Sequence, residues 1–301
     1  MYSRENNWND GDEMKLARFN GGRMGIIVDG TLRDVTDAAG VDPEAWPPVG
    51  PNQIIASFDA KKDVLLRAAA AAEAVSLEDV SFETPVPWPH KLIAIPVNYQ
   101  AHAVEMSSPA IASNAGFFVL SSSSLSGAGE SIILPDLPGR EVHHEAELAV
   151  IIGRGGRHIS REDALSHIFG YSCLLDITVR GRQERAIRKS YDSFTPVGRW
   201  ITTADEVGDP GNLQIRLWVN EDLRQDVNTR DMIVDVPEIV SMCSSVMTLE
   251  PGDIIATGTG DGVGPIRAGD TVKIEIARVG QMSVNVRQGR GGSNIAIPAT
   301  V

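Results

Sequence analysis

Residues 143–153 read His-His-Glu-Ala-Glu-Leu-Ala-Val-Ile-Ile-Gly, and this stretch decides the fold. Its second half is a continuous apolar run, which is typical of a strand buried on both faces. Side chains alternate faces along a strand, so Glu145 and Glu147 point the same way. Two carboxylates that close repel each other unless a cation lies between them. The pattern predicts a buried strand that begins either at a solvent-facing end or at a divalent cation site.

Outward from this stretch, short β-like runs dominate the chain, and helices are few. Expected strands lie at Leu92–Ile95, Gly116–Leu120, Leu148–Ile152, Tyr171–Leu175, Leu213–Val219, Asp253–Thr257 and Thr271–Ile276. We expect a short helix from a capping start at Ser160 to His167, and another opened by Pro237 at its first position and running to about Met247. Strands that outnumber helices without alternating with them favour an α+β domain built on a mixed β-roll or β-sandwich.

The first 85 residues have a different character. Residues 1–13 form a polar tail, and residues 14–85 are expected to be a small β-rich domain that opens with short apolar runs at Met14–Phe19, Met24–Val28 and Thr31–Val35. Asp29-Gly30 is a hairpin turn signal, and Asp59–Val75 has helical composition. Prolines at 85, 87 and 89 block both helix and central strand, so we place the domain boundary there and assign residues 86–301 to a catalytic domain.

Composition excludes several classes of protein. The 301 residues carry a net charge of −13, which argues against nucleic acid and anionic membranes as partners. The two cysteines, Cys173 and Cys243, lie in apolar sequence, where buried free thiols are expected rather than a disulfide framework. The polar N-terminus has no apolar run, and no stretch is long enough to span a bilayer, so we expect a cytoplasmic protein.

Two glycine-rich segments invite a nucleotide-binding interpretation, which their context disfavours. The segment 258–264 follows an expected strand but runs into Pro265 and another turn. A phosphate loop would run directly into a helix. Thr259 in this segment remains a candidate ligand contact, because glycine-rich backbone can approach a ligand closely.

A third carboxylate strengthens the metal interpretation. Asp176 ends the apolar run 171–175, where an isolated buried charge would be costly. Three hard oxygen ligands without cysteine suit Mg²⁺, Mn²⁺ or Ca²⁺, and they leave positions open for water or substrate. His143 and His144 are further candidate ligands, although they are more often residues that flank such a site.

Two polar segments are candidates for acid–base chemistry and anion recognition. If residues 99–105 form a helix, His102 and Glu105 lie on one face, where the carboxylate would orient the imidazole. The alternative is a surface His–Glu pair. After Asp176, Arg180 and Lys189 could recognise an anion beside the metal, or could belong to a solvated helix face.

In this order, the motifs resemble the fumarylacetoacetate hydrolase superfamily over roughly residues 91–286, with the small N-terminal domain that many members carry. The motifs are Asn98-Tyr99-x-x-His102-x-x-Glu105, Glu145-x-Glu147-Leu148, Asp176 with Arg180 and Gln183, Lys189-Ser190-Tyr191-Asp192, and the segment Leu249–Thr259. Each motif is weak alone, whereas the ordered set is specific.

The resemblance implies a mixed β-roll catalytic domain, usually in a homodimer, with a Mg²⁺-type ion on Glu145, Glu147 and Asp176. It implies that His102, paired with Glu105, activates water, and that Lys189 is a catalytic residue. Members act on small 2-oxo acids in the catabolism of aromatic or sugar acids. The remaining implied residues would hold the substrate oxygens: Tyr99, Arg180, Gln183 and Thr259.

The implied reaction is hydrolysis of a C–C bond in a 1,3-dicarbonyl acid such as an acylpyruvate, with a metal-held enolate as leaving group. One alternative is decarboxylation of a 3-oxo acid of the oxaloacetate type, or hydration or isomerisation of a related 2-oxo acid. A second alternative is a non-catalytic homologue that retains the metal site.

Five residues depart from the family pattern: Pro96, Leu120, Gly181, Arg199 and Gly260. Leu120 stands where a lysine is common. Its apolar side chain leads to the hypothesis that the pocket lacks a cation and takes a less anionic or bulkier substrate than a simple acylpyruvate dicarboxylate.

Overall fold

The strand predicted within residues 143–153 lies at the centre of the largest sheet. In the computed structural model, which describes residues 14–108 and 111–290, β11 (Ala146–Ile152) pairs antiparallel with β12 (Ile168–Leu175) and with β18 (Ile254–Thr259). Every residue of these three strands is buried, as their apolar composition requires. The described part of this sheet has 13 strands. The others are β1 (Lys15–Phe19), β2 (Arg23–Val28), β3 (Thr31–Asp34), β4 (Ala74–Ser76), β5 (Phe82–Glu83), β6 (Leu92–Ala94), β7 (Phe118–Leu120), β8 (Leu125–Gly127), β14 (Thr195–Val197) and β15 (Trp200–Thr203).

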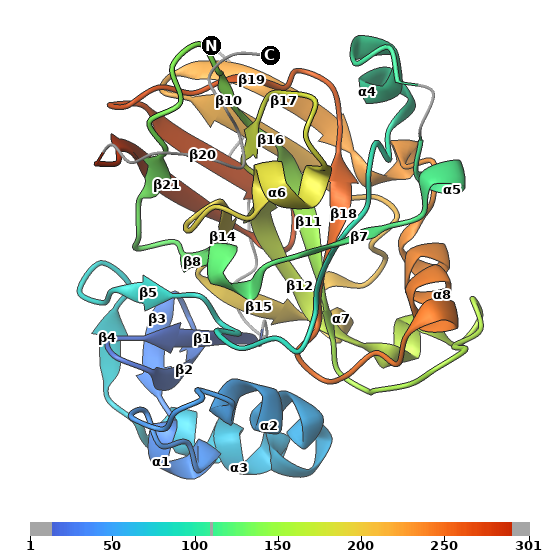
Figure 1. The fold of residues 1–301 in the computed structure, drawn as a ribbon. Coiled ribbons are helices and arrows are strands. Elements are labelled where there is room, and N and C mark those ends of the chain that lie inside the picture. The colour runs from blue at the N-terminus through green and yellow to red at the C-terminus, as the bar shows by residue number, and fades with distance from the viewer. Residues whose placement is uncertain (1–13, 109–110, 291–301) are drawn as a thin grey trace, which may run out of the picture.

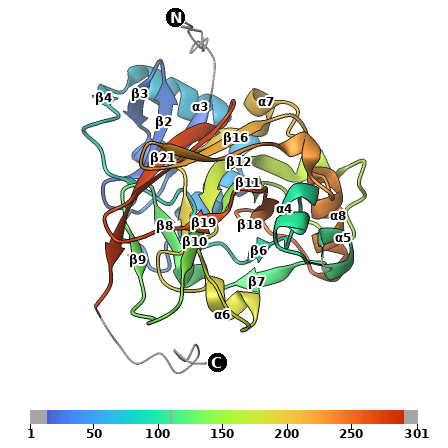
Figure 2. The same cartoon turned by 90° about the horizontal axis from the view of Figure 1, so that it is seen from above.

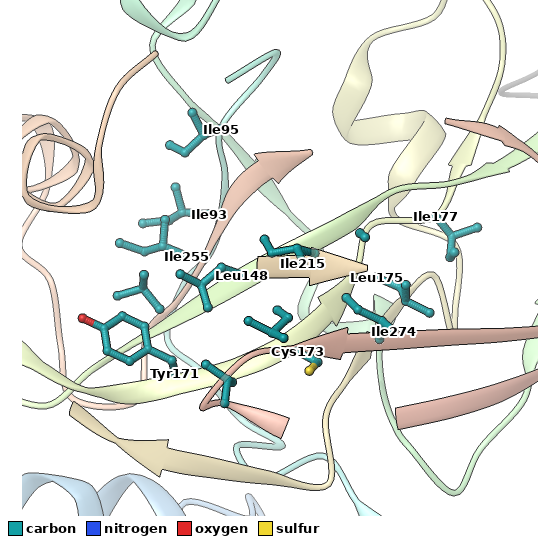
Figure 3. Packing of buried hydrophobic residues seen from close by; sticks show 14 of the residues in the cluster. Ile93, Ile95, Leu148, Tyr171, Cys173, Leu175, Ile177, Ile215, Ile255 and Ile274 are labelled. Carbon is teal, nitrogen blue, oxygen red and sulfur yellow. The ribbon is translucent and has the colours of Figure 1, made fainter. Parts of the chain in front are cut away.

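A second sheet packs against the first and closes the core. It contains β9 (Ile132–Leu134), β16 (Gln214–Val219), β17 (Asp222–Asn228), β20 (Thr271–Ile276) and β21 (Gly280–Gln288). Leu148 and Cys173 of the first sheet meet Ile215 and Ile274 of the second in one apolar cluster (Figure 3). A small third sheet joins β10 (Val142–His144), β13 (Thr178–Val179) and β19 (Gly264–Pro265). The mixed sheets with few helices confirm the predicted α+β class.

Helices lie around the sheets, as Figure 1 and the perpendicular view of Figure 2 show. The α-helices are α1 (Thr36–Ala39), α2 (Gly50–Ala56), α3 (Phe58–Ala71), α4 (Gln100–Glu105), α5 (Ala112–Ala115), α6 (Arg185–Lys189), α7 (Ala204–Val207) and α8 (Val236–Val246). Short 3₁₀ turns occur at Ser122–Ser124, Ala164–His167 and Thr229–Asp231. Within the described residues, no helix is long and apolar enough to cross a bilayer.

The N-terminal strands extend the main sheet. β1 pairs antiparallel with β15, and α3 packs on β2 and β3 (Figure 1). The predicted hairpin turn is confirmed, because Asp29 and Gly30 both adopt left-handed backbone with φ of 48° and 68°. Residues 85–89 contain neither helix nor strand, as their prolines require. The domain limits at 14–85 and 86–301 stay a prediction, and the tail 1–13 lies outside the described residues.

Most predicted elements form within a few residues of their expected bounds, with three corrections. The helix expected at 160–167 is wrong. Ser160 and Asp163 do exchange the expected capping bonds of 3.0 and 3.1 Å, but only a 3₁₀ turn follows before β12 begins at Ile168. The helix expected at 59–75 ends at Ala71, because Val75 belongs to β4, which pairs with β3. Pro237 stands second rather than first in α8, whose N-cap is Asp235.

Candidate active site

The three predicted carboxylates meet where β11 begins and β12 ends. The two strands are antiparallel, and the backbone N–H of Asp176 donates to the carbonyl of Glu145 at 2.9 Å, so the two residues lie directly opposite. Glu147 follows Glu145 on the same face. Ligand oxygens of all three side chains lie within 4.8 Å of one another, and each residue is at most 6% exposed. The register of this strand pair therefore builds the cluster that the alternation of side chains suggested.

Two cations contact the cluster from the chain that follows β12. Lys189, at the end of α6, donates to Glu145 Oε2 at 2.7 Å and to Asp176 Oδ2 at 2.5 Å. The Arg180 guanidinium lies 3.4 Å from Glu145 Oε1. Three carboxylates against two cations leave a formal charge of −1. The site therefore attracts a further cation.

Burial and mutual repulsion disturb the titration of the cluster. Burial and the neighbouring Asp176 raise the pKa of Glu147 well above its usual range. Burial also raises the pKa of Asp176, against the opposing effect of Lys189. Burial acts on Glu145 in the same direction, but Lys189 and Arg180 outweigh it, so the pKa of Glu145 is lowered. Unless another cation binds, the folded protein resists ionising all three groups together.

The residues present fit a divalent cation. Asp176 Oδ1 is buried and has no hydrogen-bond partner among the described residues, so one carboxylate oxygen remains for a ligand bond. The backbone N–H of Gly258 donates to Glu147 Oε2 at 2.7 Å and fixes that carboxylate. An all-oxygen donor set without cysteine suits Mg²⁺, Mn²⁺ or Ca²⁺. Glu145, Glu147 and Asp176 would hold the ion.

The predicted His–Glu pair forms at the same cavity. Its two residues lie on α4, where His102 Nδ1 is 2.9 Å from Glu105 Oε2. The other Glu105 oxygen accepts from the backbone N–H of Gly262 at 3.0 Å, which ties α4 to the glycine-rich loop. His102 is only 4% exposed and lines the cavity. A carboxylate on Nδ1 holds the proton there, so Nε2 is the nitrogen that can accept a proton.

A cavity of about 440 Å³ brings most of the predicted residues together. The three carboxylates, His102, Lys189, Arg180 and Thr259 all line it. Tyr99 and Gln183 do not line it. The Tyr99 hydroxyl and Gln183 Oε1 are buried without a hydrogen-bond partner among the described residues. A substrate contact for these two residues stays a prediction.

The two candidate histidine ligands have other partners. His143 Nε2 lies 2.9 Å from Glu141, and His143 Nδ1 accepts from Arg180 at 2.9 Å. His144 Nδ1 lies 3.2 Å from the Gln225 side chain, and burial lowers the pKa of His144 to about 4. Neither belongs to the group of described side chains whose ligand atoms converge. These contacts fit the interpretation that the two histidines flank the site, and His143 holds the Arg180 side chain.

Gln225 is a site residue that the sequence did not reveal. It comes from β17 of the second sheet and is 1% exposed. Its amide nitrogen donates to Thr259 Oγ1 at 2.9 Å, and its amide oxygen accepts from the backbone N–H of Ala146 at 3.0 Å. Gln225 therefore locks Thr259 to the start of β11 and leaves the hydroxyl proton of Thr259 free to donate to a ligand. Only the fold brings these residues together, so no local motif could have indicated the contact.

Leu120, which stands where a lysine is common in the family, was hypothesised to leave the pocket without a cation, but the structure places it elsewhere. Leu120 is 6% exposed and packs in an apolar cluster with Leu92 and Val86, and it does not line the cavity. Its apolar side chain therefore says nothing about the charge at the site. Gly260 is required sterically, because a Cβ there would lie 2.5 Å from Val227.

Comparison with known proteins places this site in a family. Residues 91–287 match the family described as fumarylacetoacetate (FAA) hydrolase C-terminal. The chain is 40% identical over 286 residues to a maleylpyruvate hydrolase of Aquipseudomonas alcaligenes, which covers 91% of this chain and 99% of that protein. It is 39% identical over 221 residues to an oxaloacetate tautomerase of Bacillus subtilis (strain 168). That match covers 69% of this chain and 73% of the tautomerase. A crystal structure of maleylpyruvate hydrolase from Sphingobium sp. SYK-6, in complex with manganese(II) ion and pyruvate, matches with a TM-score of 0.86 at 50% identity over 92% of this chain and 100% of that chain.

The fold and site define a metal-dependent enzyme built on buried carboxylates. The chain belongs to the fumarylacetoacetate hydrolase family, as its motifs suggested. The predicted mixed-sheet fold of that type is confirmed.

Proposed function

We propose that this enzyme hydrolyses a C–C bond in a 2,4-dioxo acid, releasing pyruvate and a carboxylic acid. The observation that carries the proposal is the placement of His102 in one cavity with the carboxylate triad. A base for water and a centre that accepts the charge of a departing enolate are the two components that this cleavage needs. The high identity to maleylpyruvate hydrolases over nearly the whole chain supports the same assignment.

Different residues would act at the two ends of the C–C bond that is cleaved. When bound, a divalent cation supplies a Lewis acid that draws charge from the 2-oxo end of the substrate. Lys189, Arg180 and Thr259 line the cavity beside the carboxylate triad, where they would donate hydrogen bonds to the carboxylate and carbonyl oxygens of that end. At the other end of the bond, His102 Nε2 would accept a proton from the attacking water.

The proposed bond changes balance without a further reactant. His102 takes the proton, and the water oxygen adds to the distal carbonyl carbon. The intermediate then collapses to a carboxylic acid, and the C–C electron pair passes to the pyruvate enolate. The proton on His102 goes to the enolate carbon and yields pyruvate, while Glu105 stabilises the imidazolium between the two transfers.

Substitution of the base tests this assignment. In His102→Ala we expect the Mn²⁺ affinity measured by titration calorimetry to be unchanged, while kcat falls by about 10²–10⁴-fold because general-base help is lost. The exposed His90 provides the control substitution His90→Ala, for which both quantities should stay at the wild-type level. Near-wild-type kcat in His102→Ala would refute the role of His102 as base.

A second candidate function uses the same residues without water attack. The similarity to an oxaloacetate tautomerase over two thirds of the chain favours testing oxaloacetate as a substrate. Its tautomerisation or decarboxylation needs enolate stabilisation, which the triad and Lys189 could provide. Turnover of oxaloacetate without cleavage of any acylpyruvate would favour this alternative. Failure to convert either class would favour a non-catalytic homologue.

The resemblance also leads us to propose a homodimer that uses Mg²⁺ or Mn²⁺ in the cytoplasm. Light scattering coupled to size exclusion tests the dimer, and comparison of rates with each metal tests the ion.

A further inference from the structure

Four cationic side chains line the cavity, and three of them contact the carboxylate cluster or backbone carbonyls beside it. Lys189 and Arg180 contact the carboxylates. Arg188 is half-buried and donates to the backbone carbonyls of Gln183 at 2.8 Å and Val179 at 3.1 Å. Arg185 also lines the cavity, but it forms no hydrogen bond or ion pair within residues 14–108 and 111–290. Among these four cations, Arg185 is the one whose guanidinium has no carboxylate or carbonyl partner within the described residues.

The formal charges of the lining side chains show what that ligand must be. Four cations, Arg180, Arg185, Arg188 and Lys189, oppose three carboxylates, so the lining carries a formal charge of +1. A divalent cation raises the sum to +3. An acylpyruvate carries one negative charge, and its enolate carries two. A substrate with a second carboxylate reaches −3 as the enolate and balances the cavity.

The position of Arg185 matches the distal end of such a substrate. Arg185 and Lys189 are four residues apart at the two ends of α6, so they share one helix face and lie about 6 Å apart along the axis. Lys189 contacts the carboxylate cluster, and Arg185 lines the same cavity from the other end of α6, where it could reach the far end of a bound acid. The Arg185 charge also adds to the effects, led by burial, that lower the pKa of Arg188, and an anion beside Arg185 would relieve this repulsion.

We propose that Arg185 binds the distal carboxylate of the substrate and thereby selects 2,4-dioxo dicarboxylic acids over monocarboxylic ones. A guanidinium can bind a carboxylate with two parallel hydrogen bonds, which makes it suited to this selection. The proposal rests on the proposed function for the identity of the reacting end. It reverses the expectation, based on Leu120, of a less anionic substrate.

A matched pair of substrates tests the proposal. 2,4-Dioxoheptanedioate and 2,4-dioxoheptanoate differ only in a terminal carboxylate against a methyl group. In Arg185→Gln we expect kcat/KM to fall about 10- to 100-fold for the dicarboxylate, the cost of a lost charged hydrogen bond, and to stay near wild type for the monocarboxylate. Arg185→Lys should recover part of the loss. Arg182→Gln is the control, because Arg182 is exposed and does not line the cavity. An equal effect of Arg185→Gln on both substrates, or none on either, would overturn the proposal.

A binding measurement separates this proposal from the proposed function. Both acids are titrated into Mn²⁺-loaded His102→Ala, with and without Arg185→Gln. We expect tighter binding of the dicarboxylate, and loss of that preference in the double variant. If the wild type cleaves neither acid but the preference is present, the proposed function fails while Arg185 keeps its role. Equal affinities of His102→Ala for the two acids would reject the role of Arg185 whatever the activity.

Discussion

Lys189 bridges two of the three buried carboxylates, so its removal should destabilise the metal-free enzyme strongly. Lys189 is 5% exposed and donates to Glu145 at 2.7 Å and to Asp176 at 2.5 Å. Lys189→Met keeps most of the side-chain volume but removes the charge. The formal charge of the cluster with Arg180 then changes from −1 to −2. Leaving buried charges without their partner costs about 3–5 kcal/mol, which corresponds to a fall in Tm of about 6–20 °C for a chain of this size.

The dependence on metal distinguishes this electrostatic effect from a loss of packing. With Mn²⁺ bound, the variant cluster is formally neutral, so the loss of Tm relative to wild type should be smaller in Mn²⁺ than in EDTA. Differential scanning fluorimetry in both buffers measures this difference. Lys62→Met is the matched control, because Lys62 pairs with Asp205 at 3.0 Å on the surface with side-chain exposures of 38% and 58%. Such a pair contributes about 0–1 kcal/mol. The reasoning is refuted if the Tm of Lys189→Met falls no further than that of Lys62→Met. It is also refuted if the Tm of Lys189→Met falls as far in Mn²⁺ as in EDTA.

Three further predictions follow from the contacts of the site. Saturating the wild-type protein with Mn²⁺ at 100 times its Kd should stabilise it by about 2.7 kcal/mol, and a Tm that does not respond to Mn²⁺ would argue against a metal site. Gln225→Leu leaves the Ala146 N–H unpaired and Thr259 loose, at a cost of about 1–3 kcal/mol for the buried N–H. It should raise KM for the 2-oxo acid, whereas a lower Tm with unchanged kinetics would leave Gln225 a purely structural role. Leu120→Lys places a charge in an apolar cluster, so we expect a lower Tm without a shift in substrate preference, and a shift toward more anionic acids would restore the hypothesis based on sequence.

Several parts of the site could be predicted because they depend on local geometry. Glu145 and Glu147 share a face because side chains alternate along a strand. The His102–Glu105 contact follows from the spacing of residues on a helix, and that helix forms as predicted. The buried strands were also recognisable, because continuous apolar runs of that length suit few other elements.

Other parts depend on which strands and loops meet, which one sequence does not specify. The register that sets Asp176 opposite Glu145 is a property of the β11–β12 pair. Gln225 reaches Thr259 from the other sheet. Arg185 was not singled out, because only the path of α6 brings it to the cavity. The error at Leu120 has the same origin, since a family pattern does not show whether a changed side chain faces the cavity or the apolar core.

The products formed from 2,4-dioxoheptanedioate provide the most direct test of the central claim. The purified enzyme is incubated with this acid in Mn²⁺ and in EDTA, and the products are identified by NMR. We predict equal amounts of pyruvate and succinate in Mn²⁺ and an intact substrate in EDTA. Release of carbon dioxide in place of pyruvate, or cleavage at the same rate in both buffers, would contradict metal-dependent hydrolysis.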